Sequence, residues 1–221
     1  MPDSERCERC RNTSLWAPPT RRSRAVGHEV ACAQCVKGHA ETMGTVVGLH
    51  VSERHGFSKH EVGEVELIAG VGVRGDVHAG PLVQHRSRVA ADPTQPNLRQ
   101  IHLIDTALLE ALATAGHQVS PGDLGENVTT KGVEAHELSA GSVIRLGETA
   151  LVAVTGLRNP CAQIEAFRPG LLKQMSYRDD EGVLVRRAGI MGVVVLGGVV
   201  RFGDRIEVRP PPGPPRPLER V

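Results

Sequence analysis

The 221-residue sequence is poor in aromatic side chains, with one Trp, one Tyr and three Phe. So few rings exclude the stacking platforms with which proteins hold single-stranded nucleic acid. An excess of one charge is also lacking, because 26 Lys and Arg residues face 25 Asp and Glu residues and the net charge is +1. We therefore expect no nucleic-acid partner and no attraction to a membrane surface.

Long apolar segments are absent as well. No stretch approaches the roughly 20 apolar residues of a membrane-spanning helix. The first residues are charged where a secretory signal peptide would be apolar. These two absences predict a cytoplasmic protein. Its five cysteines are then expected to be reduced, which favours metal binding or catalysis over disulfides.

Composition divides the chain into three regions. Residues 1–42 are polar, rich in Arg and Cys, and lack sustained periodicity. Residues 43–209 have the Val- and Gly-rich composition of a compact, strand-rich domain. Residues 210–221 contain a run of prolines that cannot form a regular hydrogen-bonded ladder, which predicts an extended or disordered tail.

The central region is predicted to be mainly β. Its strand candidates are short, rich in Val and Ile and separated by glycines: 45–51, 63–68, 100–104, 142–146, 149–155, 183–186, 191–196 and 205–208. Many short strands with glycine between them are typical of barrels and sandwiches.

A few short helices are expected between the strands. Apolar residues at helical spacing predict one over residues 105–115, ended by Gly116. Another is expected to begin near Pro160 and to break at the Pro-Gly pair 169–170. A short helical piece is then expected over 171–175.

Cys161 is the most informative single residue, because it follows a predicted strand and precedes a predicted helix. Asn159 is expected to cap this helix and Pro160 to take its first position, which would place Cys161 in the first turn. Free backbone N–H groups and the helix dipole would stabilise a thiolate there, and Arg158 adds positive charge. This context favours a reactive or metal-binding sulfur over a small buried apolar cysteine.

Four further segments combine glycines with polar side chains. Their candidate site residues are Lys59 in 55–59, Asp76 and His78 in 74–80, Arg86 in 85–88, and Asn127 and Thr129 in 121–130. Each segment taken alone also has a purely structural explanation. Asp76 and His78 suit a turn with a core histidine, Lys59 and Arg86 suit a solvated basic face, and residues 121–130 suit a hairpin. Together they supply cations and amide and hydroxyl donors, which with a thiolate suit a phosphorylated, metal-bearing cofactor.

Five of these motifs occur in a fixed order: His-Gly-Phe-Ser-Lys at 55–59, Gly-Asp-Val-His-Ala-Gly at 75–80, His-Arg-Ser-Arg-Val at 85–89, Pro-Gly-Asp-Leu-Gly-Glu-Asn-Val-Thr-Thr at 121–130 and Gly-Leu-Arg-Asn-Pro-Cys at 156–161. Their order and spacing resemble the MOSC domain, a family named after the C-terminal domain of molybdenum cofactor sulfurase. The resemblance is to its stand-alone bacterial members and covers residues 43–209. Linked motifs are much more specific than any one of them.

The resemblance implies a closed, mostly β barrel whose groove binds the molybdenum cofactor, a molybdopterin. Cys161 matches the family's cysteine, which implies a molybdenum ligand or a carrier of sulfur as a persulfide. The motifs also carry over the cofactor-contact candidates Lys59, Arg86, Asn127, Thr129 and Arg158. Asp76 and His78 match too, with a role that is either contact or structural.

The implied activity is that of an oxidoreductase acting on N-hydroxylated and related N-oxygenated small molecules. A separate electron-donor protein is then required, because the sequence shows no Fe–S spacing, flavin fingerprint or haem attachment motif. The alternative within the same pocket is sulfur transfer during assembly of a metal–sulfur cofactor. The sequence lacks the aminotransferase-like domain of true cofactor sulfurases, so we expect no pyridoxal phosphate chemistry.

The N-terminal region carries two Cys-x-x-Cys pairs, Cys7 with Cys10 and Cys32 with Cys35, with 21 residues between them. Four thiolates at such spacing suit tetrahedral zinc, which a segment with almost no core would need in order to fold. The residues between the pairs, however, lack strand alternation, and Met43 resembles a natural start of the barrel. Residues 1–42 are therefore a zinc module, a disordered extension or a consequence of start-site assignment.

Two other classes of function stay open on the residues alone. The cysteine-rich segment would make the protein an interaction module with the barrel as an accessory. Cys161 paired with His78 or another histidine would make it a cysteine hydrolase, although no local signature of such enzymes surrounds Cys161. Molybdenum content separates the reductase from the hydrolase.

Overall fold

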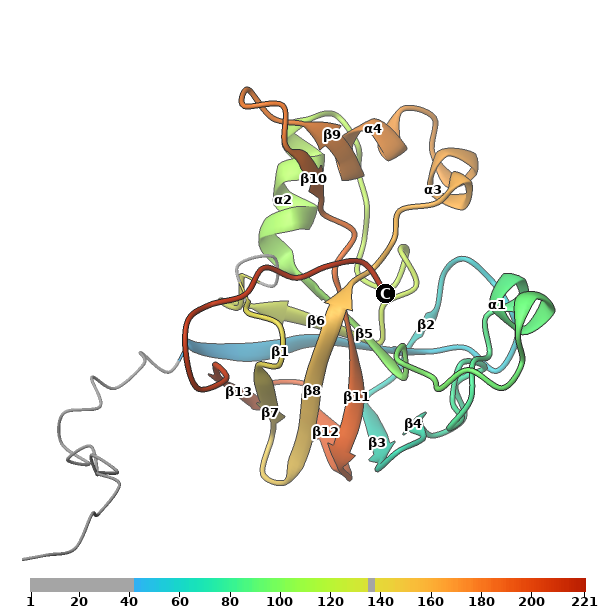
Figure 1. The fold of residues 1–221 in the computed structure, drawn as a ribbon, viewed down its shortest axis with the longest axis vertical. Coiled ribbons are helices and arrows are strands. Elements are labelled where there is room, and N and C mark those ends of the chain that lie inside the picture. Colours follow the sequence, from blue (N-terminus) through green and yellow to red (C-terminus); the bar gives the residue numbers. More distant parts are fainter. Residues whose placement is uncertain (1–41, 135–137) are drawn as a thin grey trace, which may run out of the picture. The chain divides into compact units, whose positions relative to one another are not determined.

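Seven strands close into a β-barrel in the computed structural model, which describes residues 42–134 and 138–221. In barrel order they are β1 (Thr42–Val51), β13 (Arg205–Arg209), β7 (Val143–Leu146), β8 (Ala150–Leu157), β11 (Ile190–Leu196), β5 (Ile101–Asp105) and β6 (Val128–Lys131). The β1–β13 pairing closes the barrel. All neighbours are antiparallel except β5 and β6, which run parallel (Figure 1).

Aliphatic side chains fill the barrel, as the scarcity of aromatic residues requires. Along β8 buried positions alternate with partly exposed ones, because successive side chains of a strand point to opposite faces. Val152 of β8 packs in one cluster with Val46, Leu103, Ile144 and Ile206 from other strands. The inward faces of the strands therefore form the first core of the molecule.

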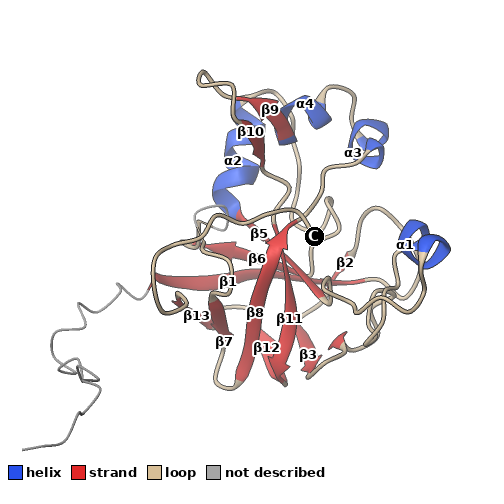
Figure 2. Ribbon diagram, viewed as in Figure 1, coloured by secondary structure: helices blue, strands red, loops and turns tan. Residues whose placement is uncertain are grey.

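Shorter strands lie outside the seven-strand barrel. They are β2 (His60–Glu61) beside β1, a sheet of β12 (Gly198–Arg201), β3 (Glu64–Ile68) and β4 (Gly72–Val73), and a ribbon of β9 (Ser176–Arg178) with β10 (Leu184–Arg186). Figure 2 shows the β9–β10 ribbon beside helices and away from the barrel strands.

Helices gather at one end of the barrel (Figure 2). They are α2 (Thr106–Thr114), α3 (Ala162–Phe167) and α4 (Leu171–Met175), while α1 (Arg86–Ala91) lies apart. Leu112 of α2, Ile164 of α3 and Met175 of α4 pack together in a second buried cluster. Asp105 caps α2 by accepting a hydrogen bond from the backbone N–H of Ala107 at 2.8 Å.

The predicted mainly β, closed barrel with a few short helices is confirmed, and each predicted strand overlaps an observed one. The sequence reasoning missed β6, because it placed Thr129 and Thr130 in a loop. Both threonines are buried, and their hydroxyls donate to the carboxylates of Glu126 and Asp105. Satisfied hydroxyls let polar residues occupy a strand that is buried on both faces. The helix α1 was also missed, because none of its residues is buried and no apolar face marks it.

The proline-rich segment, for which composition predicts an extended or disordered tail, forms no regular strand but makes specific contacts with the barrel. The backbone N–H of Ala140 donates to the carbonyl of Arg216 at 2.8 Å, and that of Leu157 donates to the carbonyl of Glu219 at 2.7 Å. Leu218 joins the barrel core cluster. Proline excludes a regular ladder, but the residues between and after the prolines still bond to neighbouring loops and to the end of β8.

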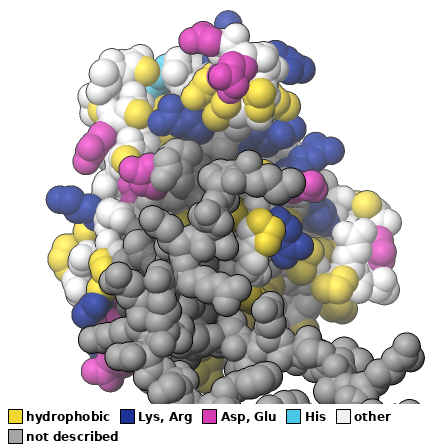
Figure 3. Space-filling model, turned by 60° about the vertical axis from the view of Figure 1, so that its left-hand side comes forward, with side chains coloured by type: hydrophobic (Ala, Val, Ile, Leu, Met, Phe, Trp, Pro, Cys, Tyr) yellow, Lys and Arg dark blue, Asp and Glu magenta, His cyan; other side chains and the backbone are white. Residues whose placement is uncertain are grey.

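The four cysteines Cys7, Cys10, Cys32 and Cys35 lie outside the described residues, so their zinc site stays a prediction. No helix in the described ranges has the length and apolar character that crossing a membrane requires. Figure 3 shows one face of the described part, on which basic and acidic side chains are interspersed with hydrophobic ones.

Candidate functional site

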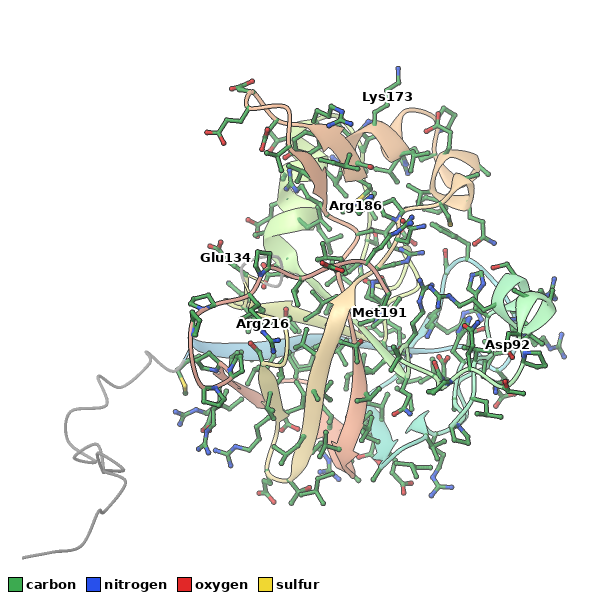
Figure 4. All side chains as sticks on the ribbon, in the orientation of Figure 1. Asp92, Glu134, Lys173, Arg186, Met191 and Arg216 are labelled. Carbon is green, nitrogen blue, oxygen red and sulfur yellow. The ribbon has the colours of Figure 1, made fainter. Side chains whose placement is uncertain are left out.

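A cavity of about 500 Å³ lies where β8 ends and β11 begins. Met191 lines it and pairs across the sheet with Gly156 of β8 and His102 of β5. Figure 4 shows Met191 at the end of the barrel strands. The volume is that of an ordinary small-molecule or cofactor pocket. The cavity is therefore positioned by the barrel strands and completed by the loops that follow them.

Five cationic side chains line the cavity, and no Asp or Glu is among the described residues that do so: Lys59, Arg86, Arg88, Arg99 and Arg158. Lys59 has a carboxylate partner behind it, whereas none of the four arginines has an ion-pair partner within the described residues. This charge distribution attracts an anion.

Arg99 and Arg158 each place a buried polar atom in this region without a hydrogen-bond partner among the described residues, Nε of Arg99 and Nη1 of Arg158. Burial, with the charges of Arg88 and Arg158, lowers the pKa of Arg99 to about 10. Burial also lowers the pKa of Arg158. Arg99 nevertheless stays protonated at neutral pH. Unpaired donors of this kind are costly unless a ligand accepts their hydrogen bonds.

Lys59 forms a buried ion pair with Asp76, with Nζ 2.6 Å from Oδ2 and side chains 6% and 2% exposed. Burial lowers the pKa of Lys59 by more than Asp76 and Glu126 raise it. Burial by itself would raise the pKa of Asp76. Hydrogen bonds from His78 and the charge of Lys59 lower the pKa by more, so it lies below the usual range of an aspartate. Lys59 lines the cavity and Asp76 does not, so Asp76 positions the lysine from behind.

Asn127 lines the cavity, but its amide is fully engaged with the protein. Its Oδ1 accepts from the backbone N–H of His102 at 3.2 Å, and its Nδ2 donates to the carbonyl of His50 and to Asp76 at 3.1 and 3.0 Å. These bonds tie β5, β1 and the Asp76 loop together. Asn127 therefore holds the wall of the cavity in place.

Thr129 does not line the cavity, contrary to its choice as a cofactor contact. It is fully buried, and its hydroxyl donates to Oε1 of Glu126 at 3.2 Å. The same Oε1 accepts from the backbone N–H of Gly122 at 2.6 Å, and burial raises the pKa of Glu126. Thr129 thus supports the turn from which Asn127 projects.

Cys161 lines the cavity, but its local geometry corrects the prediction of a first-turn cysteine. The helix α3 begins at Ala162, and Cys161 is its N-cap with extended backbone, φ −134° and ψ 169°. The residue before a proline is biased away from the helical region, which explains why Asn159 is not helical; Pro160 also lies outside α3. The half-buried thiol contacts Oε1 of Gln163 at 3.6 Å. Cys161 interacts electrostatically with Arg99 and Arg158 and raises the pKa of each, against the larger lowering by burial.

Arg158 is held at the end of β8 by three contacts. Its backbone N–H donates to the carbonyl of Gly189 at 2.9 Å, and its guanidinium lies 5.7 Å from the ring centroid of Phe57. A guanidinium over an aromatic ring is a favourable cation–π pair. Glu126 adds an electrostatic attraction. These contacts orient the side chain that the Arg-x-x-Cys motif predicted to reach the cofactor.

Four histidines also line the cavity: His55, His78, His85 and His102. His78 has its Nδ1 3.3 Å from Oδ1 of Asp76 and makes ring contacts with His55 and His85. Burial lowers the pKa values of His85 and His102. The sequence reasoning singled out only His78 among the four.

The structure therefore brings together Cys161, Arg158, Lys59, Arg86, His78 and Asn127 in one cavity. Arg88 lies within the 85–89 motif, from which the sequence predicts only Arg86 as a contact. Arg99 was missed, because it follows a turn-rich segment before β5 and belongs to none of the motifs. The only feature of the sequence that marks Arg99 is its position as a single arginine just before a buried strand.

The fold and the site together are a closed β-barrel with a cavity lined by arginines and a thiol. A family model of the MOSC domain matches residues 74–207, more than half of the sequence. The chain belongs to the MOSC domain family.

Solved structures with the same fold include the YuaD protein of Bacillus subtilis, 24% identical with a TM-score of 0.62 over 76% of this chain and 96% of that one. The YiiM protein of Escherichia coli is 20% identical with a TM-score of 0.51, over 80% of this chain and 72% of its own. YiiM of Geobacillus stearothermophilus is 18% identical with a TM-score of 0.50, over 75% of both chains. No curated protein matches the sequence. These similarities concern the fold.

Proposed function

We propose that the cavity binds the molybdenum cofactor and that the protein reduces N-hydroxylated small molecules, with Cys161 as the molybdenum ligand. The observation that carries the proposal is one cavity lined by a half-buried thiol and by four arginines, none of which has an ion-pair partner among the described residues. Binding of the molybdenum cofactor is associated with this family. The reductase role and the ligand role of Cys161 go beyond that association.

The residues present fit an anionic, phosphorylated pterin. Guanidinium groups hold phosphate by charge-assisted, often bidentate hydrogen bonds. The unpartnered Nε of Arg99 and Nη1 of Arg158 are donors that such a group would satisfy. The thiol of Cys161 is a soft donor, and soft thiolate ligands select metals that favour sulfur. When bound, the cofactor would supply the two-electron chemistry that removes oxygen from nitrogen.

The protein's own groups would orient and neutralise the bound molecules. Lys59, fixed by Asp76, presents its ammonium at the cavity wall, and Arg158, fixed by Phe57, presents its guanidinium beside Cys161. Electrons would come from a separate donor protein, since the sequence shows no Fe–S spacing, flavin fingerprint or haem motif.

Replacement of Cys161 by Ser tests the proposal. We expect protein made in a host with intact cofactor synthesis to lose bound molybdenum, and reduction of a hydroxylaminopurine to fall by at least about 100-fold, the upper range for loss of a supporting contact to a metal ligand. Metal analysis and a reductase assay with a chemical electron donor measure the two effects.

Ala166→Ser is the matched control, because it places the same hydroxyl on an exposed position of α3. It should retain molybdenum and activity. Full activity in Cys161→Ser would remove Cys161 from the mechanism, and wild-type protein without molybdenum or pterin would contradict the proposal as a whole.

A sulfur-carrier role is the second candidate, and the half-buried position of the Cys161 thiol favours it. Its only hydrogen-bond partner among the described residues is the weakly placed Gln163. Such a thiolate would attack the terminal sulfur of a donor persulfide, displace the donor's thiolate and hold the transferred sulfur as a persulfide. Mass spectrometry of the intact protein would then show one additional sulfur atom that is absent from Cys161→Ser.

A further inference from the structure

The cavity contains one histidine whose environment differs from that of the other three. His78 faces a carboxylate, with Nδ1 3.3 Å from Oδ1 of Asp76. The backbone N–H of His78 also donates to Oδ1 at 2.9 Å, which fixes the two residues to each other. Its second ring nitrogen, Nε2, has no hydrogen-bond partner among the described residues. A histidine bound to a carboxylate through one nitrogen presents the other for chemistry.

Within the described residues, the remaining cavity histidines lack the carboxylate partner that His78 has. His102 is buried, its Nε2 lies 2.8 Å from the carbonyl of Ala188, and burial lowers its pKa well below the ordinary value. Burial and Arg99 lower the pKa of His85, whose Nδ1 lies 3.0 Å from the hydroxyl of Ser87. Burial and Arg86 lower the pKa of His55. None of these three has a carboxylate within the contacts described.

We propose that His78 is the proton donor of the reaction and delivers the proton on Nε2 to the oxygen that leaves the substrate nitrogen. The Asp76 carboxylate keeps a proton on Nδ1, so that the mobile proton is the one on Nε2. The side chain is 30% exposed, and water therefore returns the proton after each turnover. This role rests on the proposed reductase function.

The step balances for an N-hydroxylamine. The N–O bond breaks and receives two electrons, which the separate electron-donor protein of the proposed function would supply. One proton, from Nε2 of His78, completes the water molecule that leaves. A second proton, from solvent, completes the amine. Transfer of one proton leaves His78 neutral with hydrogen on Nδ1, the form that Asp76 stabilises.

The charged and titratable groups that face His78 are Asp76 at its Nδ1, Lys59 behind Asp76, and the rings of His55 and His85 on either side. Asp76 is thus the only anion in this set. It offsets the positive charge that the imidazolium adds to an arginine-rich cavity.

His78→Gln tests the proposal. We expect it to retain wild-type molybdenum content while the rate of N-hydroxylamine reduction falls about 100-fold, the low end of what a general acid contributes. Free imidazole should restore part of the activity of His78→Ala. His60→Gln, an exposed histidine of β2 outside the cavity, is the matched control and should keep both properties.

A measurement without substrate tests the same assignment. Nitrogen NMR of the histidine rings in wild-type protein, followed as the pH is raised until the rings are neutral, should show that the hydrogen remaining on His78 is the one on Nδ1. Hydrogen on Nε2 in the neutral ring, unchanged activity in His78→Gln, or loss of molybdenum from that variant would each overturn the role. Wild-type protein that binds molybdenum but reduces no N-hydroxylated substrate would refute the proposed function itself, and the proton-donor role with it.

Discussion

Asp76 is the side chain on which several polar contacts of the cavity wall converge. It accepts from Nζ of Lys59 at 2.6 Å, from Nδ2 of Asn127 at 3.0 Å and from the backbone N–H of His78 at 2.9 Å. A buried carboxylate with this many donors is stabilised in its charged form. Its partners include three of the residues that line the cavity. One buried side chain therefore sets the position of several cavity groups.

Replacement of Asp76 by Asn should destabilise the protein by about 3 kcal/mol, because it leaves the buried ammonium of Lys59 without a counter-charge. Urea unfolding at neutral pH measures this free energy. In the double variant Asp76→Asn with Lys59→Met, both charges are gone, and part of the loss should be recovered. A single variant as stable as the wild type would contradict the prediction.

The Asp76→Asn variant should also differ from the wild type in how its free energy of unfolding depends on pH in acid. The pKa of Asp76 is lower in the folded than in the unfolded chain, so its stabilising contribution is complete above the unfolded value of about 3.9 and is lost as the pH falls below it. The unfolding free energy of the wild type should therefore decline more steeply below about pH 4 than that of Asp76→Asn. Parallel curves would show that Asp76 is not the group responsible.

At the scale of elements, the turn before β6, which leads into Asn127, contains a glycine that packs closely against the segment carrying Lys59. Gly122 has φ +85°, and a Cβ there would lie 2.6 Å from Cδ2 of His50 and 2.9 Å from the carbonyl oxygen of Lys59. The carbonyl of Gly122 accepts from the backbone N–H of Lys59 at 2.9 Å. Any side chain at this position would thus displace the backbone that carries Lys59.

Gly122→Ala should therefore destabilise the protein by about 2 kcal/mol or more, the cost of a left-handed non-glycine residue plus the clash. Gly116→Ala is the matched control, because Gly116 also has φ +85° but no neighbour within 4 Å of its Cβ position. Thermal and urea unfolding compare the two. If both variants lose equal stability, the close approach to His50 and Lys59 has no energetic role.

Helix α1 shows how an element can serve the site without contributing to the core. None of its residues is buried, yet its arginines Arg86 and Arg88 line the cavity. A helix of six residues is too short to be stable through its own hydrogen bonds. Its position is therefore set by the loops that flank it, which hydrophobic periodicity does not reveal.

At the scale of the whole molecule, the end of the described chain closes over the strand that leads to Cys161. The backbone N–H of Leu157 donates to the carbonyl of Glu219 at 2.7 Å, and that of Val221 donates to the carbonyl of Leu157 at 3.2 Å. Leu157 immediately precedes Arg158. Segments distant in sequence thus meet directly beside the candidate site.

Removal of residues 218–221 should lower the free energy of unfolding by about 2–4 kcal/mol, through loss of the buried Leu218 side chain and of the two backbone hydrogen bonds at Leu157. The full-length variant Leu218→Ala separates the side-chain part, and calorimetry measures both. Truncation should also reduce molybdenum retention, since the segment carrying Arg158 and Cys161 loses its support. A truncated protein with wild-type stability and molybdenum content would contradict both expectations.

The amino-acid sequence by itself determined the fold class and the identity of the thiol. Period-two alternation of Val, Ile and Leu indicates strands wherever one face is buried, and glycine spacing marks the turns between them. The five motifs indicated Cys161, Arg158, Lys59 and His78, all of which line the cavity. The motifs were sufficient to indicate these four residues, because each motif contains both the turn residues and the functional group that it positions.

Only the tertiary structure decided which polar residues face a ligand. Asp76 and Thr129 lie behind the cavity, whereas Arg99, outside every motif, lines it with an unpartnered nitrogen. β6 exists because its threonine hydroxyls find Glu126 and Asp105 after the barrel closes. Burial and hydrogen-bond satisfaction depend on residues far apart in the chain, and spacing along a sequence does not encode them.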